Sequence, residues 1–415
     1  MIRLFRAFVL CALAFLLALS GAGCALANID SYSALLDAVS QASNDDILII
    51  TGVIAADESD PPLSSNVNLI IRGAESSVAE LVGVRIDSMN VGFSNVSFPR
   101  GLEIQGNSNV QLMSGTRAEG NNGNSAITMV GSGTLHIDRG SAIIGGANAT
   151  GQGGDGILLQ ASNGDIALVI EGSVIGGAGR NGGSALTLSG LNNQSSVSVG
   201  GMIAGGDGTR TGGNAVNLYD SADRASVHIS GTVTGGTGGR TGGSAVQIVN
   251  VSGAASVELT GSARGGNGAY YGGDTLVAMN VAGSLVLSGR LRGGDVSANG
   301  QRPGAALRLL DALTTQNTSL NNAMIEDGQV LPTPATPVPK VEATATVEET
   351  AEPTAEPTAE PTAVPSDVPA EEAADTPADE TAEAPVEETE EVNSTEEIGE
   401  TESVMEETEA TGTGA

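Results

Sequence analysis

Lysine, tryptophan and cysteine are nearly missing from this chain of 415 residues. The only lysine is Lys340, there is no tryptophan, and the other large aromatic residues are five phenylalanines and four tyrosines. A core with so few rings must be built from aliphatic and small side chains, which favours narrow stacked strands over a bulky globular interior. Both cysteines, Cys11 and Cys24, lie in an N-terminal segment that we expect to be removed, so disulfide bonds are not expected to hold this fold.

The N-terminal segment, residues 1–27, is predicted to be a signal peptide. Arg3 and Arg6 precede an apolar run over residues 7–19, which is too short to span a membrane, and Ala-Leu-Ala at 25–27 has the small residues of a cleavage site. Gly-Ala-Gly-Cys at 21–24 is similar to a bacterial lipoprotein box except at Gly21, where an aliphatic residue is expected. Lipidation of Cys24 therefore stays an alternative to plain secretion. Either way, we expect a bacterial protein that is secreted or exposed at the cell surface.

The formal charge of −32 is concentrated at the C-terminus. Residues 341–415 hold 24 acidic side chains and no lysine or arginine, which leaves −8 for residues 1–340. Such a chain repels nucleic acid, and no basic stripe with interleaved aromatic residues opposes that repulsion, so nucleic-acid binding is excluded. Eleven of the fifteen prolines follow Leu331. Residues 332–415 are therefore predicted to be a disordered Pro/Thr/Glu-rich acidic tail.

A segment of about thirty residues recurs along the middle of the chain. Gly-Gly-Ser-Ala-Leu-Thr-Leu at 182–188 returns, with conservative changes, at 212–218 and 242–248. The residue that opens each copy follows in steps of 29 to 31: Ser125, Asp155, Ser184, Asn214, Ser244, Asp274 and Ala305. A fixed period of this size indicates one supersecondary unit that is copied and stacked, because a single copy cannot bury its own apolar face.

Each regular unit is predicted to contain two clear strands and a shorter third one. In the unit that opens at Asn214, the expected strands are 215–219, 226–230 and 232–234. The second strand alternates so that two aliphatic residues face inward in every copy, as Val227 and Ile229 do here, and a glycine follows where the chain must bend. Strands that return in the same register imply parallel pairing between neighbouring units, and chirality favours a right-handed path.

The predicted fold is therefore all-β, a right-handed parallel β-helix of residues 28–331. Residues 31–42 have the apolar periodicity of a short helix that caps the open end of the stack, although an ordinary surface helix remains the alternative. Residues 28–119 are expected to hold this helix and irregular coils, and residues 120–331 the regular repeats. The helix, Met89-Asn-Val-Gly-Phe-Ser-Asn-Val-Ser-Phe98 and the coil repeats resemble the pectate-lyase-like β-helix superfamily of bacterial surface and secreted proteins.

That resemblance implies polysaccharide lyase or hydrolase activity, but the sequence lacks the residues that such activity requires. The lyases need acidic residues clustered for calcium and a lysine or arginine to take the proton, and Lys340 lies in the tail. The hydrolases use aspartates near Gly-His-Gly and Arg-x-Lys, and neither motif occurs. We therefore expect no enzymatic activity and no cofactor, with a carbohydrate-active enzyme that has a divergent site as the alternative.

Two metal hypotheses also fail at this stage. His136 and His228 occupy the same outward position of the second strand but three units apart, about 14 Å at a strand spacing of ~4.8 Å, which is too far to share a metal ion. Gly-Gly-Asn-Gly-Ala-Tyr-Tyr-Gly-Gly-Asp at 265–274 is similar to calcium-binding nonapeptide repeats, but the aspartate does not recur every nine residues. These glycines are instead predicted to form a flexible turn that protrudes from each coil.

The same protruding turn carries the candidate ligand-binding residues. Arg180, Arg210 and Arg240 recur at one position, followed by Tyr270 with Tyr271 beside it. Arginines stacked at strand spacing would repel one another by about 1 kcal/mol even in water, so such a column either splays apart or binds an anion. An extended acidic polysaccharide or cell-surface glycan could lie along it, with Tyr270 stacking on a sugar. The alternative is a flexible loop whose arginines point into solvent or pair with Asp207. The function expected from the sequence is that of a non-catalytic, adhesin-like binding module for glycan or matrix.

Overall fold

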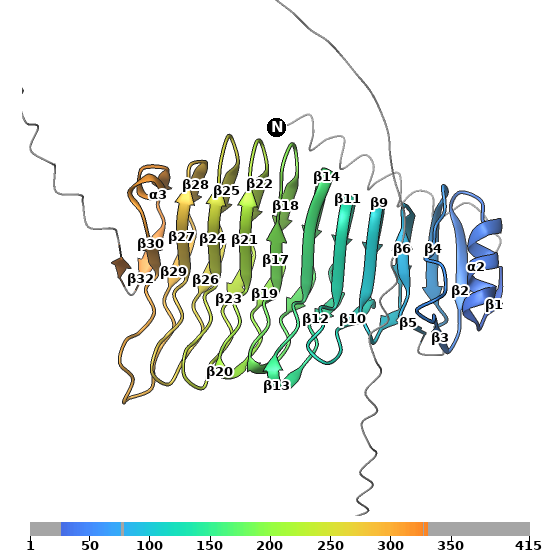
Figure 1. Ribbon diagram of the computed structural model, residues 1–415, viewed down its shortest axis with the longest axis horizontal. Coiled ribbons are helices and arrows are strands. Elements are labelled where there is room, and N and C mark those ends of the chain that lie inside the picture. Colours follow the sequence, from blue (N-terminus) through green and yellow to red (C-terminus); the bar gives the residue numbers. More distant parts are fainter. Residues whose placement is uncertain (1–25, 76–78, 327, 331–415) are drawn as a thin grey trace, which may run out of the picture. The chain divides into compact units, whose positions relative to one another are not determined.

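The structure, a computed structural model, describes residues 26–75, 79–326 and 328–330 as one parallel β-solenoid. Successive coils lie side by side, with the helix α2 (Tyr32–Gln41) at one end and the short helix α3 (Ala312–Gln316) at the other (Figure 1). The predicted tail, residues 332–415, and the predicted signal peptide lie outside the described residues, except that strand β1 begins at Leu26. No helix among the described residues is long and apolar enough to cross a membrane.

Three parallel sheets run along the stack. Sheet A contains β1 (Leu26–Ile29), β2 (Asp46–Ile50), β4 (Asn68–Gly73), β6 (Arg85–Asp87), β7 (Asn90–Ser94), β9 (Leu102–Leu112), β11 (Ile127–Ile137), β14 (Ile157–Ile170), β17 (Leu186–Ser189), β18 (Ser196–Val199), β21 (Val216–Ser221), β22 (Ser226–Ile229), β24 (Val246–Val251), β25 (Ser256–Leu259), β27 (Leu276–Val281), β28 (Ser284–Leu287), β30 (Leu307–Leu309), β31 (Thr318–Leu320) and β33 (Gln329–Val330). Sheet B contains β3 (Val53–Ala55), β5 (Glu80–Val82), β8 (Ser97–Phe98), β10 (Arg117–Glu119), β12 (Ala142–Ile144), β15 (Ser173–Ile175), β19 (Met202–Ala204), β23 (Thr232–Thr234), β26 (Ser262–Arg264), β29 (Arg290–Arg292) and β32 (Met324–Glu326). Sheet C contains β13 (Asn148–Gln152), β16 (Gly179–Asn181) and β20 (Gly208–Thr211).

The predicted strands are confirmed in the regular units. The three strands expected after Asn214 are β21, β22 and β23, and each pairs in parallel with its equivalent one coil later. One difference from the three-strand pattern concerns earlier coils, where β9 is a single strand over both of the first two strand positions. β11 and β14 likewise run through both strand positions, because no turn interrupts them.

The core fills the space between sheets A and B. The alternating aliphatic residues of the second strand are fully buried in every regular coil, as Val227 and Ile229 are. Near the N-terminal end, where the coils are irregular, Phe93 and Phe98 fill the interior and meet edge to face with ring centroids 5.0 Å apart. Helix α2, N-capped by Ser31, buries Leu35 and Val39 against the first coil. The expected capping helix is therefore present.

A narrow waist of stacked glycines separates this core from sheet C. Between residues 145 and 273, each coil contributes one glycine pair where the chain leaves the core and another where it returns, and the last coil returns through Gly304 alone. Their backbone hydrogen bonds form a continuous zigzag along the stack. Gly243 donates to Gly236, Gly236 to Gly213 and Gly213 to Gly206, each at 2.8 Å. A Cβ atom on Gly213 would lie 1.9 Å from the carbonyl oxygen of Gly183, so no other residue fits. We call this waist the glycine neck.

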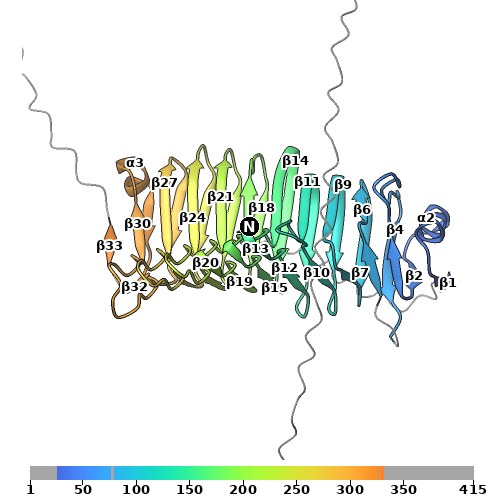
Figure 2. The same ribbon diagram turned by 60° about the horizontal axis from the view of Figure 1, so that its bottom comes forward.

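The glycine neck corrects the prediction of a flexible protruding turn. Beyond it, the segments of sheet C pair in parallel, and the pairing continues through single bridges from Gly208 to Gly238 and from Gly238 to Gly268. These stacked segments form a thin projection, here called the fin, whose strands β13 and β20 lie along the lower margin of Figure 1 and come forward in Figure 2. The glycines serve close packing between coils, with backbone hydrogen bonds across the neck and along the fin.

The residues that open each coil alternate in chemistry. Asp155, Asn214 and Asp274 each accept the backbone N–H of the opening residue of the next coil at 2.8 Å, namely that of Ser184, Ser244 and Ala305. The coils between them open with serine, so acceptor and non-acceptor coils follow one another. The structural repeat is therefore two coils, although the sequence period is one.

Candidate functional site

The fin brings the sequence-predicted residues together. Arg240 donates its backbone N–H to Arg210 at 2.8 Å, and Tyr270 donates to Arg240 at 3.0 Å, so these three residues stack in successive coils. Arg180 lies one coil earlier, where a bulge sets it opposite Thr209 and Arg210 together. We call Arg180, Arg210, Arg240 and Tyr270 the arginine column.

The side chains of the arginine column are exposed, and Tyr270 has 49% of its surface accessible. Within residues 26–330, as far as they are described, none of the three arginines forms an ion pair or a side-chain hydrogen bond. Asp207, the partner expected in the alternative interpretation, instead accepts the backbone N–H of Thr237 at 2.8 Å. The column is therefore a line of cations without counter-charges in the described structure.

Tyr271 has a different role from Tyr270. It is only half-exposed, it stacks on Thr241, and its hydroxyl donates to the side chain of Gln301 in the next coil. This bond holds Gln301 at the end of the arginine column, where its backbone N–H donates to Tyr270 at 2.8 Å. Tyr271 thus supports the last coil of the fin.

One further cation of the fin was not predicted from the sequence. Arg302 pairs with Tyr271 across the last coil of the fin, and it is exposed. The last loop of the fin is longer than the one before it: Arg302 lies six positions after Val296, whereas Tyr271 lies only three positions after the equivalent Gly268. Counting a constant thirty residues from coil to coil therefore misses Arg302. Aligning the glycine pair at 293–294 and the glycine at 304 with the earlier necks would have located it.

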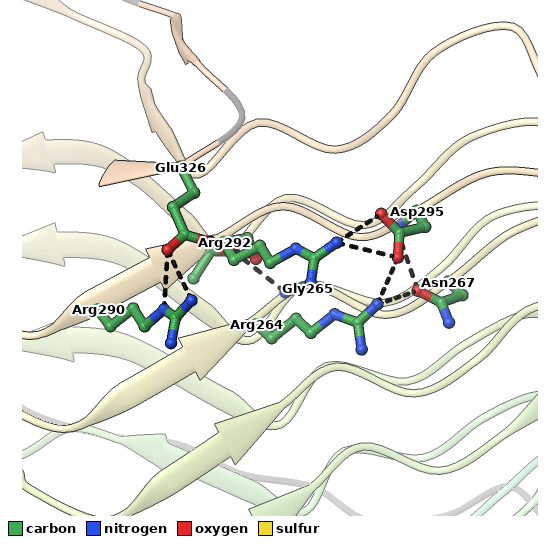
Figure 3. Close-up of polar contacts among 8 residues, drawn as sticks. Arg264, Gly265, Asn267, Arg290, Arg292, Asp295 and Glu326 are labelled. Carbon is green, nitrogen blue, oxygen red and sulfur yellow. Dashed lines mark hydrogen bonds and ion pairs between the residues drawn. The ribbon is translucent and has the colours of Figure 1, made fainter. Parts of the chain in front are cut away.

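A second group of arginines lies on sheet B, and its charges are neutralised. Arg264, Arg290 and Arg292, here called the paired group, come from β26 and β29 (Figure 3). Asp295 forms ion pairs with Arg264 at 2.6 Å and with Arg292 at 3.3 Å, and Glu326 forms an ion pair with Arg290 at 2.8 Å. Asn267 adds a hydrogen bond to Arg264 at 3.1 Å, as Figure 3 shows. The paired group is a cross-coil clamp, and it offers fewer free charges to a ligand than the arginine column does.

The two histidines lie where the sequence places them. Parallel pairing stacks His136, Val169, Ser198, His228, Glu258 and Val286 in one outward column. His228 Nδ1 lies 3.1 Å from Glu258, and His136 Nε2 lies 3.4 Å from Asp138. Among the described residues, no three His, Cys, Asp or Glu side chains are grouped to hold a metal ion.

A shallow hollow of about 500 Å³ belongs to sheet A rather than to the fin. The turns between paired strands line it with Asn193, Gln194, Asp223, Arg224, Gly253 and Ala254. It holds one carboxylate, Asp223, and one guanidinium, Arg224.

One half-buried carboxylate, Asp155, lies close to the neck. Burial raises the pKa of Asp155, while hydrogen bonds from Thr187 and Ser184 oppose that rise. At the equivalent position two coils later, Asn214 bonds Asn217 and Gln247, each at 2.8 Å. Two coils further on, Asp274 is neutralised by Arg308. In alternate coils, the same position therefore holds a hydrogen-bonded acid, an amide and an acid in an ion pair.

No protein-family model, curated protein or solved structure matches this chain with a significant score. The fin offers a linear array of arginines that have no ion-pair partner among the described residues, and this array ends in the exposed Tyr270.

Proposed function

We propose that this protein is a secreted or surface-exposed bacterial β-solenoid that binds an extended acidic glycan along the arginine column without cleaving it. The observation that carries the proposal is a contrast between two sets of arginines. Those of the arginine column have no ion-pair partner in the part of the chain that the structure describes, whereas those on sheet B are neutralised by carboxylates. The parallel solenoid with its N-terminal capping helix also supports membership of the pectate-lyase-like superfamily.

The spacing of the arginine column favours a polymer over a small anion. Neighbouring coils lie ~4.8 Å apart, which is close to the advance of one pyranose residue in an extended chain. A glycan with one carboxylate on each sugar could therefore meet one arginine in each coil. Because an exposed ion pair contributes only ~0.2 to 1 kcal/mol, several must form together before binding becomes appreciable.

Tyr270 continues the column where the arginines end. Its exposed ring can pack against the face of a sugar, as aromatic side chains do at surfaces that combine apolar and wet contacts. A ligand would then be anchored by charge over three coils and by ring packing in the fourth. Arg302 lies one coil further along and stacks on Tyr271, so it adds a cation beside the arginine column rather than within it.

The test is retention on immobilised polygalacturonate at low and high salt. We expect the triple variant Arg180→Ala, Arg210→Ala, Arg240→Ala to bind about tenfold more weakly, because three charge contacts of this size are lost. The matched control removes three other exposed arginines, in the variant Arg100→Ala, Arg139→Ala, Arg224→Ala, and should bind like the wild type. Equal retention of all three proteins would remove the column from consideration.

The same incubation tests the non-catalytic part of the proposal. Polygalacturonate kept with the protein should retain its chain length, as measured by size-exclusion chromatography. Shortened chains would instead favour a carbohydrate-active enzyme with a divergent site.

A further inference from the structure

The C-terminal end of the stack leaves part of the core uncovered. Strand β31 continues the inward column of Leu287 with Leu320, and β32 continues that of Leu291 with Ile325 (Figure 1). Leu287 and Leu291 are fully buried, but Leu320 is 45% exposed and Ile325 is only half-buried. Among the described residues, no element lies beyond this last coil to cover them.

The N-terminal end is closed. Helix α2 packs against the first coil, and the inward residues Leu48 and Ile54 of that coil are 0% and 1% exposed. The outer face of α2 is polar, since Ser33 and Asp37 are exposed on it. The two ends of the same core are therefore finished in different ways.

Exposed hydrophobic side chains gather at the open end. Nine large hydrophobic side chains are exposed among the described residues, and five of them lie in the last two coils, namely Met279, Leu310, Leu313, Leu320 and Met324. A concentration of exposed apolar surface on one part of a protein marks an interaction site.

The last coil also has free strand edges. β31 pairs with β28, β32 with β29 and β33 with β30, and within the described chain no strand pairs with the other edge of these three. A free edge presents backbone N–H and C=O groups that a strand of another chain can satisfy. The open end therefore offers backbone partners as well as apolar side chains.

Charge favours a second copy of the same end as the partner. Residues 26–60 hold seven carboxylates and no lysine or arginine, so the N-terminal end is strongly acidic as well as closed. Residues 302–326 hold two arginines and two carboxylates, which cancel. Two C-terminal ends can therefore meet without net repulsion, and each covers the open core of the other.

We propose that two copies of this chain associate through their C-terminal ends about a two-fold axis, so that the two open cores pack against each other. The last coil, residues 305–330, holds 26 residues, which is within the ~20 to 30 that a standard interface uses on each side. A two-fold axis sets the free edges antiparallel, a pairing that strands form readily, and it closes the assembly at two copies.

This dimer does not depend on the glycan proposal. It carries two arginine columns, so a polymer long enough to reach both would bind it more tightly than it binds one copy. The association itself needs no ligand.

The test is the mass of the chain from Leu26 to Ala415, measured by sedimentation equilibrium over a wide range of protein concentration. We expect a dimer that grows no further. The double variant Leu320→Asp, Met324→Asp should be a monomer, because charges then replace apolar side chains at the open end. The matched control, Val53→Asp, Met202→Asp, changes two exposed apolar residues elsewhere on sheet B and should stay dimeric.

A second measurement leaves the apolar side chains intact. Residues 26–415 contain no cysteine, so a single cysteine can be placed at the exposed Asn322, between β31 and β32, or at the exposed Gln41, the last residue of α2. A bismaleimide linker should join two copies of the Asn322→Cys variant and leave the Gln41→Cys variant uncrosslinked. Cross-linking that needs a mixture of the two variants would show head-to-tail contact and overturn the proposal.

Three results of the mass measurement would also overturn it. One is a wild type that stays monomeric at every concentration, including one that dimerises only after residues 331–415 are removed. Another is a mass that keeps rising beyond two copies. The third is equal dimerisation of the double variant and its control.

Discussion

The arginine column of the fin and the paired group of sheet B use the same side chain under opposite conditions. Glu326 lies one coil beyond Arg290, and Asp295, which follows the glycine pair 293–294, pairs with Arg264 of the previous coil and with Arg292 of its own. Arg264 and Arg290 therefore each link two neighbouring coils. The fin places its arginines beside threonine, glycine and tyrosine, beyond a neck that leaves no room for side chains. Arginines that stabilise the fold are neutralised by neighbouring carboxylates, whereas arginines available to a partner are held away from carboxylates.

The largest expected effect comes from breaking the neck that holds the fin apart. Gly213→Ala places a Cβ atom 1.9 Å from the carbonyl oxygen of Gly183, and we expect it to lower the free energy of unfolding by about 3 kcal/mol. Gly200→Ala is the matched control, because its added Cβ atom would lie 3.9 Å from the nearest atoms, the carbonyl oxygen of Ile170 and the hydroxyl of Ser230. Urea unfolding of both variants gives the comparison. Equal stability would show that the neck yields to a methyl group.

A smaller effect should follow from freeing the paired group. Asp295→Ala leaves Arg264 and Arg292 without their shared carboxylate, and we expect a loss of about 1 kcal/mol of stability, as for exposed ion pairs. The same variant should gain retention on polygalacturonate, because Arg264 would then lose the carboxylate that neutralises it.

Asp37→Ala, on the exposed face of α2, removes an equal charge and serves as its control. A gain in retention by Asp37→Ala as large as that of Asp295→Ala would mean that net charge, rather than local pairing, governs binding.

The pH dependence of stability tests how much the burial of Asp155 costs, because this carboxylate is not paired with an arginine as Asp274 is with Arg308. Burial raises the pKa of Asp155 above 3.8, so the folded state binds the proton more tightly than the unfolded state does. The wild type should therefore lose stability as pH rises from 3.8 through the raised pKa, whereas Asp155→Asn should not. Asparagine fits this position, as Asn214 shows two coils later.

Unfolding by urea across a pH series measures that difference. We expect the asparagine variant to be the more stable protein at pH 7 and to lose this advantage below pH ~3.8, where the wild-type carboxyl is protonated in both states. The opposite trend would mean that the hydrogen bonds from Ser184 and Thr187 outweigh burial.

The smallest effect is expected from the arginine column itself. Changing Arg180, Arg210 and Arg240 to alanine should alter the free energy of unfolding by less than about 0.5 kcal/mol, because these exposed side chains have no partners among the described residues. A slight gain at low salt is expected from the loss of mutual repulsion. A loss of more than 1 kcal/mol, measured by thermal unfolding, would contradict a purely ligand-binding role.

The repeat made most of the solenoid predictable. A period of about thirty residues and the alternation of Val227 and Ile229 identify parallel coils and their inward faces, because burial on one side of a strand requires that pattern. The register of Arg210, Arg240 and Tyr270 followed from the same period. Residues 332–415 lie outside the described structure, and their predicted disorder stays a prediction.

Other features were hidden because they depend on contacts between coils. The glycine pairs look like a flexible turn in sequence, and only stacking shows that Gly236 and Gly213 bond each other across a neck. The clamp of Asp295 on Arg264 joins residues thirty-one positions apart through side-chain reach, which the period does not specify. Arg302 was missed because its loop is longer than the rest.

The alternation of the opening residues sets the step by which this molecule can lengthen or shorten. Excision of residues 184–243 would bring Ser244 under Asp155 and recreate a seam like the one that Ser184 makes now. Excision of residues 184–213 would instead set Asn214 against Asp155, so that two acceptor side chains follow in succession. Gene duplication and loss in this rod should therefore succeed in even numbers of coils.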